Sequence, residues 1–217
     1  MQTKSMNRSN PTTKATDRRE RLIGAVIAET VESGYADLGV EGIVRRAGVT
    51  PDLFHSQFAD KKAAVEAAYE SLSGRYLSRL LQTCKAQSSW PLKVKVGIGA
   101  TLDMVAAAPV EAQFLTAEAM AIDDDFRQRV LDSRDRLARL LVAGRTESPH
   151  GAGLPGVIES ALVGGIAGVI SAQLQDGEAK HLPALAPELV EFALTPYLGR
   201  EEAAEVAGRP RPPAKGF

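Results

Sequence analysis

The stretch from Glu32 to Thr50 reads ESGYADLGVEGIVRRAGVT and contains the most informative pattern for predicting the fold. Its second half predicts a short helix over residues 40–47 that buries one apolar face. Gly48 ends that helix, because glycine readily adopts the left-handed backbone found at helix C-termini. Thr50 is a natural N-cap and Pro51 suits a first helical turn, so a third helix starts at once. Two short helices joined by a tight glycine turn predict a helix-turn-helix unit, whose second helix enters the major groove of DNA.

Helical patterns continue on both sides of this unit. A first helix is predicted from Thr16 or Asp17 to Gly34, with Asp17 and Glu20 forming a start that resembles a capping box. Asp60 is expected to cap a long fourth helix. Further helices are predicted over residues 90–107, 109–121, 123–144, 154–177 and 186–198. Since no alternating strand pattern of useful length occurs, the sequence predicts an all-α fold of about nine helices.

The composition agrees with packed helices. Hydrophobic residues make up 44% of the chain but aromatic residues only 5%, a balance that suits helices better than sheets. The net charge of −1 does not by itself point to nucleic acid. Residues 1–62, however, carry ten Lys and Arg against eight Asp and Glu. A mildly basic head on a mildly acidic body is compatible with phosphate contact at one end.

The compartment is predicted from features that the chain lacks. Cys84 is the only cysteine, so an intrachain disulfide is impossible and secretion gains no support. Residues 1–16 contain no apolar segment typical of a signal peptide. The most apolar run, residues 161–172, is too short to cross a bilayer. We therefore expect a cytoplasmic protein with no membrane partner.

Four parts are predicted along the chain. Residues 1–15 are polar and lack aromatic side chains, which predicts a flexible arm. Residues 16–62 form the helix-turn-helix domain, and residues 63–199 form a larger helical body. Residues 200–217 are expected to be a disordered tail, because their end is rich in proline and basic residues.

The head resembles the N-terminal domain of the TetR family of transcriptional regulators. The resemblance covers residues 21–65 and includes RLIGAV at 21–26, the stretch at 32–50, and the step from Phe58 to Lys61. Three positions depart from the family pattern. Gly39 stands where Ser or Thr usually caps the second helix, Asp52 where a small residue is usual, and His55 where Tyr is usual. These departures bear on the DNA sequence preference and leave the fold prediction unchanged.

The resemblance implies a set of DNA-contacting residues on and around the third helix. They are Arg45, Thr50, Pro51, His55, Ser56 and Lys61. Lys61 is expected to meet a phosphate at the start of the fourth helix, where amide groups also favour anions. For Arg45 the alternative is an ordinary solvated surface charge. Phe54 and Phe58 are expected in the core of the head.

The family's body binds a small molecule and dimerises through its last two long helices. A pocket for a mainly apolar effector is predicted from residues of the middle helices: Met104, Gln113, Phe114, Glu118 and Met120. Their alternative role is ordinary core packing. A dimer interface is predicted at Gly164, Gly165 and Gly168, since small residues let helix backbones approach closely. The alternative there is close packing within one subunit.

These features predict a sequence-specific DNA-binding regulator. It would bind a palindromic operator as a homodimer and act as a repressor that a small effector releases. The alternative is a helical protein that binds a ligand or partner and has weak or no operator binding. An enzyme, a cofactor and a metal site are not expected, because His55, His150 and His181 are far apart in the sequence and no nucleotide-binding or hydrolase motif occurs.

Overall fold

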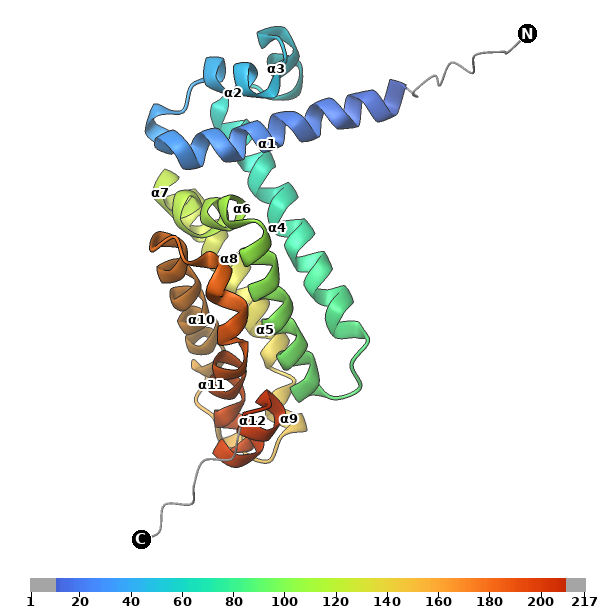
Figure 1. Ribbon diagram of the computed structural model, residues 1–217, viewed down its shortest axis with the longest axis vertical. Helices are drawn as coiled ribbons and strands as arrows, with labels where there is room; N and C mark the ends of the chain where they lie inside the picture. The colour runs from blue at the N-terminus through green and yellow to red at the C-terminus, as the bar shows by residue number, and fades with distance from the viewer. Residues whose placement is uncertain (1–10, 210–217) are drawn as a thin grey trace, which may run out of the picture. The chain divides into compact units, whose positions relative to one another are not determined.

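The computed structural model describes residues 11–209, with side chains from residue 16 onward. The chain divides after Ser71 into two compact units. Every regular element between residues 11 and 209 is helical, which confirms the predicted all-α fold (Figure 1). Helix α4 (Lys61–Lys85) begins in the first unit and continues into the second.

The first unit is the predicted three-helix head with the start of α4. Its helices are α1 (Pro11–Asp37), α2 (Val40–Ala47) and α3 (Pro51–Gln57). Apolar side chains from all four helices form its core, which includes Leu22, Val26, Ile43, Phe54 and Val65. Each of these five is fully buried. Phe54 and Phe58 are thus core residues, as predicted.

Helix α1 differs from its prediction at the N-terminal end. It begins at Pro11, so the arm predicted over residues 1–15 is helical from Pro11, and residues 1–10 lie outside the described range. At the other end, Gly34 has φ 77° and ψ 160°, a backbone that interrupts the helix where its end was predicted. A residue with a Cβ rarely adopts this conformation, which explains the glycine. One further turn, up to Asp37, follows the kink.

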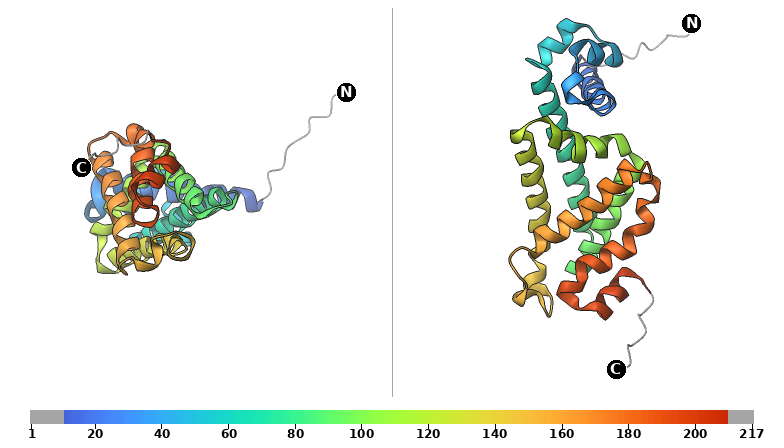
Figure 2. Two further views of the ribbon diagram at one scale, coloured as in Figure 1. Left: turned by 90° about the horizontal axis from the view of Figure 1, so that it is seen from below. Right: turned by 90° about the vertical axis from the view of Figure 1, so that its left-hand side faces the viewer.

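The second unit is a helical bundle completed by short helical turns. Its elements in chain order, after the end of α4, are α5 (Trp90–Ala107), α6 (Pro109–Gln113), the π-helical turn η1 (Phe114–Glu118), α7 (Ala119–Ile122), α8 (Asp124–Leu141), α9 (Gly144–Glu147), η2 (Gly151–Gly153), α10 (Ile158–Gln175), η3 (Ala179–Leu185), α11 (Ala186–Leu198) and α12 (Arg200–Ala207). Helix α11 packs against α5, and α12 folds back onto α11 (Figure 2). The bounds of α5 agree with the prediction, and those of α11 agree as well.

A buried polar cluster fixes the loop that connects η2 to α10 in this bundle. Glu159 of α10 is 5% exposed and accepts hydrogen bonds from Arg145 Nε at 2.7 Å and from the Tyr197 hydroxyl at 3.0 Å. Arg145 also donates to the carbonyls of Leu154 and Pro155, both at 2.8 Å. The cluster therefore satisfies a buried carboxylate and fixes the loop that precedes α10.

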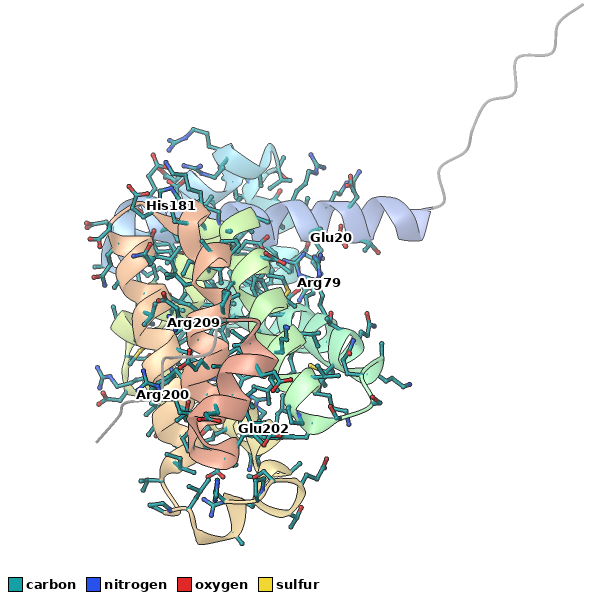
Figure 3. The ribbon with its side chains drawn as sticks, turned by 60° about the horizontal axis from the view of Figure 1, so that its bottom comes forward. Glu20, Arg79, His181, Arg200, Glu202 and Arg209 are labelled. Carbon is teal, nitrogen blue, oxygen red and sulfur yellow. The ribbon has the colours of Figure 1, made fainter. Side chains whose placement is uncertain are left out.

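The predicted disordered tail is wrong over its first part. Residues 200–207 form α12, whose Ala203 and Ala204 are buried against the rest of the bundle. Arg209 Nη1 donates to Glu191 Oε2 at 2.8 Å and so ties the end of α12 to α11; Figure 3 labels Arg200 and Arg209. The tail was predicted from its proline content, which begins only at Pro210. Residues 210–217 lie outside the described range.

Helix α10 is unusual in being both apolar and poorly covered. By length and composition alone it could cross a membrane, although only 17% of its residues are buried inside the described part of the chain. The prediction that no apolar run is long enough considered residues 161–172 alone, and the helix extends beyond them at both ends. One such helix is weak support for a membrane span, because core helices of soluble proteins meet the same criteria of length and composition.

Candidate functional site

Helix α3 is the second helix of the predicted helix-turn-helix unit, which we call the reading helix, and it begins as the sequence predicts. Gly48 has φ 63°, the left-handed conformation that ends α2, and the Val49 amide donates to the Val44 carbonyl at 3.1 Å. Thr50 then caps α3, because its Oγ1 accepts from the Leu53 amide at 3.3 Å. Phe54 anchors the helix in the core with no exposed surface. The tight turn and the cap together fix where α3 begins.

One side of α3 is left exposed by this arrangement. Thr50, Pro51, His55 and Ser56 are exposed, and Asp52 lies among them. The Ser56 hydroxyl donates to the Leu53 carbonyl at 2.7 Å, and its oxygen can still accept a further bond. The structure thus places four of the six predicted DNA-contacting residues together on one short helix and its cap.

The two arginines of α2 have different environments. Arg46 donates to Glu29 Oε2 at 2.6 Å and to Glu32 Oε2, and hydrogen bonds to Glu29 and then Glu32 raise the pKa of its guanidinium. Arg45 has an 80% exposed side chain, and its Nη2 is 4.0 Å from Glu29 Oε1. Arg46 therefore attaches α2 to α1, while Arg45 presents its charge to solvent. Sequence alone does not distinguish these neighbouring residues.

Gly42 leaves room for the Glu29 side chain beside α2. A Cβ at this position would collide with the Glu29 carboxylate. Glycine therefore lets the carboxylate lie over α2, where Arg46 reaches it. The pattern GIVRR thus has a structural basis in its first residue that sequence analysis missed.

Lys61 begins α4, as predicted, but its ammonium group has partners within the chain that were not predicted. Its Nζ donates to the carbonyls of Tyr35 at 3.1 Å, Ala36 at 3.3 Å and Leu38 at 3.1 Å. It also lies 4.8 Å from the centre of the Tyr35 ring. An ammonium group has three hydrogens to donate. All three hydrogens therefore have acceptors within the chain, and the phosphate contact of Lys61 stays a prediction.

In the second unit, a cavity of about 260 Å³ lies between η1 and the C-terminal half of α10. Its lining residues are mainly small or carry amide and hydroxyl groups: Gln113, Thr116, Ala117, Ser171, Leu174 and Gln175. Of the five predicted pocket residues, Gln113 lines this cavity. Four of the six side chains are polar, but apolar atoms still form the larger part of the lining surface, so the mainly apolar pocket stays a prediction.

The other predicted pocket residues are placed in different ways. Phe114 is fully buried and Met104 is 8% exposed, so both have the core role that was the alternative. Glu118 accepts from the Gln113 amide at 3.3 Å, which orients that cavity residue. Met120 Sδ lies 3.7 Å from Arg134 Nη2. Sequence reasoning missed the contribution of α10, because helical periodicity does not reveal which helices meet.

The π-helical turn forms one wall of the cavity. The Ala119 amide donates to the Phe114 carbonyl, five residues earlier, and the Thr116 hydroxyl donates to the Ala112 carbonyl at 2.8 Å. The wider turn changes the side-chain register between α6 and α7. Such turns are rare and frequently occur at functional sites.

Comparison with known proteins supports the assignment of this fold. No family model matches the chain. The helix-turn-helix-type transcriptional regulator BetI of Escherichia coli O157:H7 is 28% identical over 155 residues, which cover 69% of this chain and 80% of BetI. The fatty acid degradation regulator FadR from Bacillus halodurans superposes with a TM-score of 0.74 at 18% identity, covering 87% of this chain and 97% of FadR. A TetR-like transcriptional regulator from Rhodococcus sp. RHA1 gives 0.65 at 20% identity, covering 78% and 93%.

The chain has the fold of TetR-family regulators. The resemblance seen in residues 21–65 is thereby confirmed, and the superpositions extend the similarity of fold to the body. The TetR-like head corresponds to the first unit, with α3 as the second helix of the helix-turn-helix.

The three glycines predicted at a TetR-like dimer interface lie on exposed parts of α10. A Cβ at Gly164 or Gly168 would meet no atom within 4 Å. At Gly165 a Cβ would lie 3.2 Å from the Phe192 ring of α11 in the same subunit. Gly165 thus takes part in packing within the chain, while Gly164 and Gly168 leave an open strip on the helix. The dimer interface itself stays a prediction.

Proposed function

We propose that the chain is a sequence-specific DNA-binding transcriptional regulator. The observation that carries the proposal is the construction of α3, which is capped by Thr50, anchored by the buried Phe54 and exposed along the side that bears His55 and Ser56. The neighbouring Arg45 adds an exposed positive charge suited to a phosphate. BetI and FadR, to which the chain is similar, are themselves transcriptional regulators.

The acting form would be a homodimer on an operator with two-fold symmetry. A TetR-like head presents one reading helix, so two subunits are needed to read two half-sites. The poorly covered apolar α10 supports this proposal, because burying its exposed strip against a second copy would remove apolar surface from water. Gly164 and Gly168 would allow the two backbones to approach closely.

A small effector bound in the body would control DNA affinity. The cavity of about 260 Å³ is smaller than typical sites for drug-sized ligands, which favours a small molecule. Its lining combines a larger apolar surface with amide and hydroxyl groups, which favours a neutral, mainly apolar ligand that carries hydrogen-bonding groups. The expected action is release from the operator, as in a repressor.

The proposed function is tested by selecting genomic DNA fragments that the purified protein binds. A recurring palindromic sequence is expected. Failure to enrich any sequence, together with ligand-dependent thermal stabilisation of the body, would instead favour a ligand-binding protein without an operator; the exposed acidic Asp52 on α3 is the feature compatible with that alternative.

Arg45→Ala tests the contact with DNA at a single residue. Removal of one phosphate contact should reduce the slope of log K against log salt by about 0.9 and weaken specific and nonspecific binding alike. Arg200→Ala is the matched control, since Arg200 is an exposed arginine of the second unit (Figure 3). Equal salt slopes for Arg45→Ala and the unmodified protein would show that Arg45 is only a solvated charge.

A further inference from the structure

Lys61 joins two helices of the head at a point that the DNA contacts do not explain. The carbonyls that it reaches belong to Tyr35, Ala36 and Leu38, at and just beyond the end of α1. Carbonyls at a helix C-terminus lack partners within the helix and carry partial negative charge. A lysine ammonium is therefore a favourable cap for them. The kink at Gly34 turns this last segment of α1 out of the main helix.

The reading helix α3 is attached to α1 on both of its sides. On the side that precedes α3, Arg46 of α2 is bound to Glu29 and Glu32 of α1. On the side that follows α3, α4 begins at Lys61, only a few residues after Gln57, with Asp60 capping its first turn through the Ala63 amide at 2.8 Å. Because the connection is short, a shift of the first turn of α4 would displace α3.

We propose that Lys61 is a positioning residue, which holds the start of α4 against the end of α1 and so sets the orientation of α3, and that it is not a phosphate ligand. This inference rests on the proposed DNA-binding function. It differs from a phosphate contact in a measurable way. A phosphate contact contributes equally to every DNA sequence and to the salt dependence of binding. Correct orientation of α3 matters only for base contacts, and hence only for the specific site.

The test compares Lys61→Met, Lys61→Arg and Arg45→Ala with the unmodified protein. Affinity for the selected operator and for an unrelated duplex is measured over a series of salt concentrations. Lys61→Met is expected to weaken operator binding by about tenfold or more, a loss similar to one or two base contacts, with the nonspecific affinity and the salt slope unchanged. Arg45→Ala should instead reduce the slope by about 0.9 on both DNAs.

Lys61→Arg adds a second, independent criterion. A guanidinium keeps the positive charge and binds phosphate well, but its planar group does not match three converging carbonyls. Lys61→Arg should therefore resemble Lys61→Met. Full rescue by arginine, or an equal loss on both DNAs with a reduced salt slope, would show a phosphate contact and overturn the proposal. A lower melting temperature with an unchanged ratio of specific to nonspecific affinity would also overturn it, by showing a role in stability alone.

Amide hydrogen exchange separates this inference from the proposed function. Loss of the Lys61 contacts should accelerate exchange at residues 35–38 and in α3, whether or not DNA is present. If the unmodified protein selects no DNA, the proposed function fails, and this exchange pattern still tests the connection between α4 and α1. Unchanged exchange in both segments of folded Lys61→Met would overturn the proposed positioning role.

Discussion

At the scale of single residues, Glu159 shows how hydrogen bonds stabilise a buried negative charge. Arg145 supplies two hydrogen bonds, from Nε at 2.7 Å and from Nη2 at 2.8 Å, and Tyr197 supplies a third. The hydrogen bond from Arg145 is the largest cause that lowers the pKa of Glu159 below its ordinary value of 4.5. A lowered pKa in the folded state means that the stabilisation is present above the unfolded pKa and is lost as pH falls through the folded one.

We therefore expect Glu159→Gln to lower the melting temperature at pH 7, by roughly 5 °C, because Arg145 loses its ionic partner. The difference from the unmodified protein should shrink as pH falls from the ordinary glutamate range through the lowered pKa of folded Glu159, because the carboxylate then becomes protonated. Glu188→Gln, which removes an exposed carboxylate of α11, is the matched control. A difference in melting temperature that is the same at pH 3 and pH 7 would contradict this account.

At the scale of elements, α3 depends on its cap because it has only seven residues. Thr50→Val removes the oxygen that accepts from Leu53 while keeping the side-chain shape. The free energy of unfolding should fall by about 1 kcal/mol, as for other N-cap substitutions. Ser56→Ala is the control, since Ser56 lies near the end of α3 and caps nothing at its start. Equal denaturation midpoints for Thr50→Val and Ser56→Ala would show that the cap contributes little.

The ends of the elements show which local signals are reliable. Gly48, Thr50 and Pro51 mark the boundary between α2 and α3 correctly, because each acts on its own backbone or on the next turn. Asp123 likewise caps α8 through the Phe126 amide at 2.9 Å. The start of α1 at Pro11 was missed, since an acidic first turn at Asp17 also fits a helix interior. Helix α12 was missed because alanines that pack against neighbouring helices carry no strong sequence signal.

At the scale of the whole molecule, the proposed dimer predicts that a bulky side chain on the exposed strip of α10 weakens dimerisation. Gly168→Leu should shift the protein toward monomer in sedimentation equilibrium, because leucine fits within its own subunit but would occupy the strip needed by the second copy. Gly165→Leu is less informative, since it would also strain the contact with Phe192. Gly74→Leu, at an exposed and equally open position of α4, is the control. An unchanged dimer in Gly168→Leu would place the interface elsewhere.

The start of α1 and helix α12 could not be predicted from the sequence, but most other helices, the helix-turn-helix and the exposed side of α3 could. These depend on caps, turns and periodicity, which act over a few residues. The tertiary structure decided which charges are available for DNA. Arg46 and Lys61 find their partners on α1 and just beyond its end, 14 to 26 residues away in sequence, and Arg45 keeps its exposure. The tertiary structure also places Ser171 and Gln175 of α10 beside Gln113. Whether a charged side chain is free to bind DNA, and which residues line a cavity, depend on neighbours that are distant in sequence and meet only in the packed chain.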